Sequence, residues 1–181
     1  VKDKKEFDLV EKQLFEKLTL GSKEEFIDEF TSLEYIANRN KIKEILCRIK
    51  MVNHKDGKCL PKSAAFQYSL DPSLTEDTWN AEHWLAQNDK VGREKLDNKD
   101  DLHNIGNLLL ISRLLNKKLG NKTVPKKIEF LKDDKLAPDL QDPSLIRFIH
   151  DYAEDQKNWN SDAIKKRAKI LAEDSYKIFW K

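Results

Sequence analysis

The chain has 181 residues, of which 36% are charged and 39% are hydrophobic, and this composition suits a single soluble domain. The formal net charge of only +2 excludes a general polycation, so any affinity for nucleic acid must come from a local basic patch. No apolar run approaches about 18 residues, and residues 1–10 contain no apolar signal segment. We therefore expect neither a transmembrane helix nor a signal peptide.

The cysteines indicate the cellular compartment, and the first residue indicates whether the sequence is part of a longer protein. Cys47 and Cys59 stand alone, without a CxxC pair, which argues against a zinc knuckle or a disulfide framework. This favours a reducing compartment, and we expect the protein to be cytoplasmic. The sequence starts at Val1 rather than Met, which favours a fragment of a longer protein.

The N-terminal third is predicted to be helical. Gly and Pro are scarce, with five residues each, and apolar residues recur at helical spacing over residues 3–18. Ser22 and Glu25 form the pattern of a capping box that opens a second helix through Phe30. A third helix is expected from about Arg39 to Met51, with an apolar face of isoleucines and leucine.

The helical period is lost in the middle of the chain. The segment DTWNAEHWL, residues 77–85, suits a short strand, and residues 87–101 form a long polar loop. GNLLLIS, residues 106–112, has the composition of a short buried strand. These segments predict a hairpin with a long connection.

Further helices follow the hairpin. Ser112 can cap a helix over residues 113–119 that ends at Gly120, and a loop containing Pro125 and Pro138 comes next. Two more helices are expected to begin at the following pairs: Asp142-Pro143, and Asn160-Ser161, the latter helix reaching about Trp180.

Together these elements predict an α+β, mostly α-helical protein. A helical N-terminal segment is expected over residues 1–70 and a strand–strand–helix core over 71–130. C-terminal helices over 131–181 are expected to complete the same module.

The polar residues of this core are candidates for chemistry. Glu82 and His83 end the first predicted strand, Asn107 begins the second, and Asn116 lies in the short helix. If the hairpin folds back, His83 and Asn107 can be cross-strand neighbours, and the helix can bring Asn116 toward Glu82. One imidazole, one carboxylate and one amide would then converge.

Here the sequence resembles the HNH, or ββα-metal (His-Me finger), nucleases, and more narrowly the DUF1524 nuclease domain of GmrSD-type modification-dependent restriction enzymes. The resemblance covers roughly residues 75–181. It is carried by Glu82-His83 with Gln87, Gly106-Asn107-Leu108 with Leu110, Asn116, Asn121-Lys122 with Lys126 or Lys127, and a tail of Trp159, Ile164, Arg167 and Trp180. Ala86 departs from the pattern, because the family usually has Pro there.

The resemblance and the chemistry of the residues predict the same roles. A neutral imidazole is a natural general base, which we assign to His83, with Asn107 orienting it. Glu82 and Asn116 offer oxygen ligands, which suit Mg²⁺ or Mn²⁺. Adjacent strand residues point to opposite faces, so the metal and the base should flank the scissile phosphate rather than touch.

A local basic segment accompanies this site. Residues 113–127 contain six basic residues and no acidic one. The lysines expected to contact DNA phosphates are Lys117, Lys118, Lys122, Lys126 and Lys127.

Each candidate also has a plainer interpretation. His83 can be a core histidine between two tryptophans, Asn107 a turn residue, and Asn116 a surface amide of its helix. The lysines can form a solvated face. We expect His103 to cap the loop before Gly106, and Trp159 and Trp180 to be core residues.

The sequence thus predicts a divalent-metal-dependent DNA endonuclease or nickase, with a ββα-metal core flanked by helices. The resemblance implies the effector domain of a restriction or anti-phage defence protein that acts on double-stranded DNA, with an upstream NTP-using domain outside this fragment. A non-catalytic nucleic-acid-binding module of the same fold is the alternative, and a helical protein-interaction domain is the third.

Overall fold

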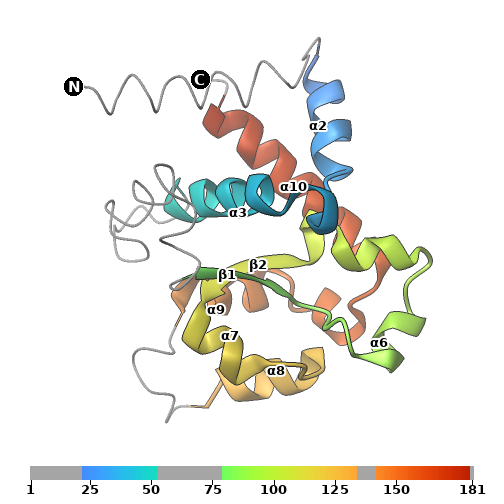
Figure 1. Ribbon diagram of the computed structural model, residues 1–181, viewed down its shortest axis with the longest axis vertical. Helices are drawn as coiled ribbons and strands as arrows, with labels where there is room; N and C mark the ends of the chain where they lie inside the picture. Colours follow the sequence, from blue (N-terminus) through green and yellow to red (C-terminus); the bar gives the residue numbers. More distant parts are fainter. Residues whose placement is uncertain (1–21, 53–78, 134–141, 180–181) are drawn as a thin grey trace.

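The computed structural model describes residues 22–52, 79–133 and 142–179. Helices dominate these ranges, and the strands β1 (Trp79–His83) and β2 (Leu108–Ser112) form a two-stranded antiparallel sheet (Figure 1). The predicted α+β, mostly helical class is confirmed. In the part of the chain described, no helix combines the length and apolar character needed to cross a membrane.

The N-terminal helices follow the sequence signals. The capping box of Ser22 and Glu25 is formed, and it opens α2 (Lys23–Thr31) as predicted. The helix α3 (Tyr35–Val52) begins four residues earlier than expected and is interrupted by non-helical backbone at Asn38. The helix predicted over residues 3–18 lies outside the described residues.

The hairpin is covered on both faces, which explains its apolar second strand. Leu108 and Leu110 of β2 pack into a core with α2, α3 and α10 (Ser161–Phe179). Leu109 and Ile111 point to the other face and pack with α7 (Arg113–Leu119), α8 (Val124–Leu131) and α9 (Pro143–Asp151). Figure 1 shows the strands between these two groups of helices. A strand buried on both sides needs apolar residues at every position.

The connection between the strands is more ordered than the sequence indicated. It contains α6 (Lys90–Glu94) and two 3₁₀ turns, η1 (Lys99–His103) and η2 (Ile105–Asn107). The predicted polar loop is therefore wrong in part. Asp89 caps α6 by accepting from the Gly92 amide, and Asn98 caps η1 by accepting from the Asp100 amide.

The segment after the hairpin holds one confirmed helix and one that was missed. Ser112 caps α7, which ends before Gly120 as expected. The predicted loop around Pro125 is instead the first turn of α8, where Pro needs no backbone hydrogen-bond donor. In the sequence alone, a Pro in the first turn of a helix resembles a loop residue.

The C-terminal helices begin where the sequence predicts. Asp142 caps α9, and the Asn160 side chain accepts from the Ala163 amide at the start of α10. The short turn η4 (Asp155–Asn158) lies between them, and Trp180 is outside the described residues.

The helix α10 fixes the start of β2. Gly106 lies so close to it that a Cβ there would be 2.0 Å from the carbonyl oxygen of Ile164. The buried Arg167 donates to the carbonyl oxygens of Gly106 (2.6 Å) and Leu108 (2.8 Å). Residues near the C-terminus thus hold the strand opposite Glu82 and His83.

Candidate active site

The candidate site lies where β1 ends. Glu82 pairs with Leu109 and His83 pairs with Leu108, so the two side chains face opposite sides of the hairpin, as expected. The expected pairing of His83 with Asn107 is wrong by one position, because the Trp84 amide donates to the Asn107 carbonyl (2.8 Å). Each side of β1 meets a different set of partners.

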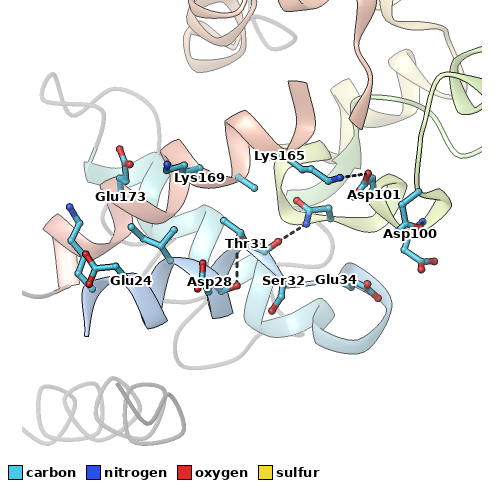
Figure 2. A pocket seen from close by; sticks show the side chains of 15 residues that line it. Glu24, Asp28, Thr31, Ser32, Glu34, Asp100, Asp101, Lys165, Lys169 and Glu173 are labelled. Atoms are coloured by element: carbon cyan, nitrogen blue, oxygen red, sulfur yellow. Dashed lines mark hydrogen bonds and ion pairs between the residues drawn. The ribbon is translucent and has the colours of Figure 1, made fainter. Parts of the chain in front are cut away.

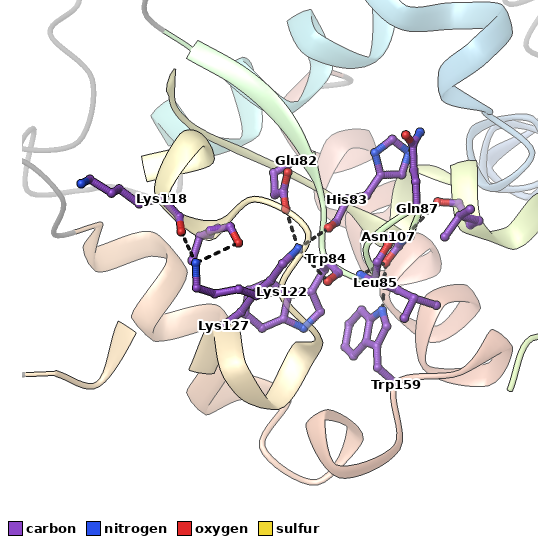
Figure 3. A network of polar contacts seen from close by, with 12 residues as sticks. Glu82, His83, Trp84, Leu85, Gln87, Asn107, Lys118, Lys122, Lys127 and Trp159 are labelled. Atoms are coloured by element: carbon purple, nitrogen blue, oxygen red, sulfur yellow. Dashed lines mark hydrogen bonds and ion pairs between the residues drawn. The ribbon is translucent and has the colours of Figure 1, made fainter. Parts of the chain in front are cut away.

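On one side, Glu82 forms a buried ion pair with Lys127 of α8 (Figure 3). The Lys127 ammonium also donates to the carbonyl oxygens of His83 (2.6 Å) and Trp84 (3.0 Å). Burial raises the pKa of Glu82 and lowers that of Lys127, and each partner's charge opposes these shifts. Three acceptors on β1 and just after it therefore share one buried cation.

This geometry corrects the prediction for Lys127. Its side chain is 0% exposed, so it cannot be a surface contact for DNA phosphates. Helical spacing explains the difference, because Lys127 shares the inward face of α8 with Val124 and Leu131, whereas Lys126 is exposed. The sequence analysis predicts a loop here rather than α8, so it gives Lys126 and Lys127 the same surface position.

The two predicted metal ligands, Glu82 and Asn116, are not joined to each other by a hydrogen bond in the described residues. The Glu82 carboxylate is already paired with Lys127, and no hydrogen bond joins it to the half-buried Asn116 of α7 in the described part of the chain. Among those residues, no group of three or more His, Cys, Asp or Glu side chains is arranged to hold a metal ion. A divalent cation at Glu82 would therefore have to replace the Lys127 ammonium.

On the other side, His83 is 8% exposed and lies against two aromatic rings. The Tyr35 ring of α3 meets it edge-on, with centroids 5.4 Å apart. His83 Nε2 lies 3.2 Å from Nδ1 of His103 and 3.5 Å from the side-chain nitrogen of Gln87. Within the described residues, His83 Nδ1 makes no hydrogen bond.

The surroundings of His83 keep it unprotonated at neutral pH. Burial, followed by the nearby His103 and Lys127, lowers the pKa of His83 from 6.5 to about 4. A general base must enter the reaction without its proton, and His83 meets this condition.

Asn107 is fully buried, and it acts on the backbone around His83 rather than on the imidazole. Its amide nitrogen donates to the carbonyl oxygens of Leu85 (3.2 Å) and Leu102 (2.8 Å). Its oxygen accepts from the Leu85 amide (2.8 Å) and the Trp159 indole (3.1 Å). Asn107 was predicted to orient His83, and none of these four bonds reaches the imidazole ring itself.

Residues 21–174 match the family described as the C-terminal domain of GmrSD restriction endonucleases. The chain belongs to this family. No curated protein and no solved structure matches it significantly. The match extends well before residue 75, where the sequence resemblance began, and includes α2 and α3.

The basic face of this GmrSD C-terminal domain is smaller than the sequence predicted. Lys117, Lys118 and Lys126 are exposed. The Lys122 ammonium turns back onto the carbonyl oxygens of Lys118 and Leu119 and lies 5.5 Å from the Phe130 ring centroid. Three of the five predicted lysines therefore present free surface on α7 and α8.

The domain also has an acidic pocket of about 790 Å³, between α2, η1 and α10 (Figure 2). Three lysines and six carboxylates line it, the latter being Glu24, Asp28, Glu34, Asp100, Asp101 and Glu173. Asp101 is buried and pairs with Lys165 (3.6 Å). Neither Glu82 nor His83 is part of the lining, and the excess of negative charge disfavours phosphate there.

Sequence reasoning missed the role of two residues at the site. His103 was expected to cap a loop, but it faces His83. Lys127 was expected on the surface, but it pairs with Glu82. The helical spacing of α8 carried a signal for Lys127, whereas nothing in the sequence indicated that His103 contacts a residue twenty positions earlier.

Proposed function

We propose that this domain is a DNA endonuclease or nickase that acts on double-stranded DNA, with His83 as its general base. Its family is one of restriction endonucleases, and this supports a nuclease role in a modification-dependent restriction or anti-phage defence protein. We further propose that it works in the cytoplasm, together with an upstream NTP-using domain.

The observation that carries the proposal is the state of His83. It lies at the end of β1 with its pKa lowered to about 4, and its Nδ1 makes no hydrogen bond to described residues. This nitrogen is not among the buried polar atoms that lack a partner in the described residues, so it is accessible to a water molecule. The proposal therefore makes Nδ1 the atom that takes the proton from that water molecule.

In the proposed reaction, His83 takes a proton from a water molecule as the water oxygen attacks phosphorus. The imidazole becomes an imidazolium, the bond from phosphorus to the leaving oxygen breaks, and the departing alkoxide takes a proton from solvent water. The backbone of His83 stays in place during this step, because its carbonyl oxygen accepts from Lys127. Lys117, Lys118 and Lys126 supply positive surface for DNA phosphates.

Dependence on Mg²⁺ or Mn²⁺ is part of the proposal, and Glu82 and Asn116 remain its proposed ligands. Both side chains have oxygen donors, which these cations prefer. The ion pair with Lys127 opposes this role, since a cation at Glu82 would require Lys127 to release the carboxylate.

The same ion pair favours a second candidate function, a nucleic-acid-binding module without catalysis. If Lys127 holds Glu82 permanently, the basic face can still bind DNA while no cation binds at Glu82. The two candidates differ in whether bound DNA is cut.

Nicking of supercoiled plasmid with Mg²⁺, with Mn²⁺ and with EDTA separates them. Endonuclease function predicts nicked or linear plasmid with either cation and intact plasmid in EDTA. Binding without nicking supports the second candidate, and the absence of both binding and nicking contradicts both candidates. Cleavage that is undiminished in EDTA would remove the metal from the proposal. His150→Ala is the control, because that side chain is 89% exposed.

A further inference from the structure

The two histidines at the site form one hydrogen-bonded unit. His83 Nε2 and His103 Nδ1 are 3.2 Å apart, and the rings meet edge to face at 88° with centroids 5.2 Å apart. A hydrogen bond between two ring nitrogens needs one proton, because one nitrogen must donate and the other must accept. The position of that proton decides which nitrogen of His83 has a free lone pair.

Two arrangements satisfy this bond. If His103 Nδ1 carries the proton, it donates to His83 Nε2, and that lone pair is occupied. In a neutral His83 the other proton is then on Nδ1, and the ring has no free acceptor. If His83 Nε2 carries the proton, it donates to His103 Nδ1, and His83 Nδ1 keeps its lone pair. The second arrangement alone leaves His83 able to act as a base.

The backbone holds the two rings in this relationship. The Asn107 side chain bonds to Leu85, two residues after His83, and to Leu102, the residue before His103. Lys127 binds the His83 carbonyl oxygen from the other side of β1. One buried amide thus joins the segments that carry the two imidazoles.

The side-chain amide of Gln87 also bears on which nitrogen of His83 carries the proton. Its side-chain nitrogen lies 3.5 Å from His83 Nε2, at the outer limit of a hydrogen bond. An amide nitrogen is a donor and would oppose a proton on Nε2, whereas the amide oxygen would accept it. The second arrangement therefore requires the Gln87 amide to turn so that its oxygen faces His83.

We propose that His103 is a positioning residue for the nuclease reaction, which accepts the Nε2–H of His83 and so fixes Nδ1 as the basic atom. This inference rests on the proposed function. When His83 takes a proton from water at Nδ1, its charge strengthens the bond from Nε2–H to His103. His103 itself does not touch the water or the phosphate in this scheme.

Imidazole ¹⁵N NMR of the full 181-residue chain tests the proton position without any need for activity. The expected result is a His83 ring with its proton on Nε2 and an unprotonated Nδ1. A His83 ring that carries its proton on Nδ1 overturns the proposal. His150→Leu, which removes an exposed histidine, helps to assign the spectrum and serves as the control.

Single-turnover plasmid cleavage by His103 variants tests the consequence. His103→Asn places an amide oxygen close to the position of Nδ1, His103→Gln places it farther along the side chain, and His103→Leu removes the acceptor. We expect His103→Leu to lower kcat about 10- to 100-fold with an unchanged KM for DNA, as for other supporting hydrogen-bond partners. His103→Asn should recover more of the rate than His103→Gln.

The outcomes separate this proposal from the proposed function. A wild-type protein that never cuts DNA contradicts the nuclease function, while the NMR result still decides where the proton lies. A wild-type protein that cuts, together with a His103→Leu variant that cuts equally fast, overturns the role of His103 alone. A folded His103→Leu variant whose defect is only in KM also overturns it.

Discussion

The two sides of β1 differ in how completely their polar groups are satisfied. On the Glu82 side, one buried ammonium from α8 serves a carboxylate and two carbonyl oxygens. On the His83 side, two imidazoles share a hydrogen bond and His83 Nδ1 has no partner among the described residues. Adjacent residues of one short strand thus differ, because the Glu82 side chain is paired with Lys127 and the His83 ring keeps one nitrogen without a protein partner among the described residues.

The two sides of β1 also differ in what a reaction there would have to break. A buried ion pair is costly to open, because each charge would lose its partner in a region of low dielectric. A nearly buried neutral imidazole with one unbonded nitrogen can gain a proton without breaking a protein contact. A cation at Glu82 would have to displace Lys127, whereas a proton at His83 Nδ1 would displace no protein partner among the described residues, although the sequence motif contains both residues.

Removal of Lys127 should have the largest effect on stability. Lys127→Met leaves the buried Glu82 carboxylate without its cation and should lower the free energy of unfolding by about 3–5 kcal/mol. Urea unfolding of the single variants and of Lys127→Met/Glu82→Gln measures the coupling. The double variant should recover much of the loss. If Lys127→Met unfolds at the wild-type urea concentration, the ion pair on this side of β1 is not important for stability.

Acidic pH should lower the free energy of unfolding through His83, on the other side of β1. The folded-state pKa of His83 is lowered to about 4 from 6.5, so the folded state resists a proton that the unfolded chain accepts. The contribution of neutral His83 to stability is therefore complete above pH 6.5 and is lost as the pH falls toward 4. Between pH 7 and 4.5 the loss should be roughly 2–3 kcal/mol.

Urea unfolding at several pH values measures this loss, with His83→Gln as the comparison because glutamine does not titrate. The stability of the wild-type protein should approach that of the variant as the pH falls. A difference between the two proteins that stays constant from pH 7 to 4.5 would contradict the lowered pKa of His83.

Contacts between residues close in the sequence could be predicted at this site, whereas contacts between distant residues could not. The roles of Ser22 and Ser112 as helix caps followed from neighbouring residues, and the structure confirms them. The inward position of Lys127 depends on α8, which the sequence analysis did not predict because Pro125 lies in its first turn. The contact of His103 with His83 depends on how the connection between the strands packs, which the local caps at Asp89 and Asn98 do not determine.

The smallest expected effect concerns the basic face on α7, which packs on the Glu82 side of the hairpin. Lys117→Glu/Lys118→Glu should weaken DNA binding and reduce the slope of log K against log salt by about one unit for each phosphate that is no longer neutralised. A titration at several salt concentrations measures the slope. Lys169→Glu, an exposed lysine of the acidic pocket, is the control and should leave it unchanged. An equal slope in all three proteins would mean that these lysines form a solvated surface.

The most direct measurement of the central claim is plasmid cleavage by His83→Ala, with its DNA binding and thermal unfolding measured on the same sample. If His83 is the general base, cleavage should fall by about 10²–10⁴-fold while the variant stays folded and still binds DNA. A variant that cuts at the wild-type rate would contradict the account. So would a variant that loses activity only in proportion to the folded protein that disappears, because His83 would then be a core histidine.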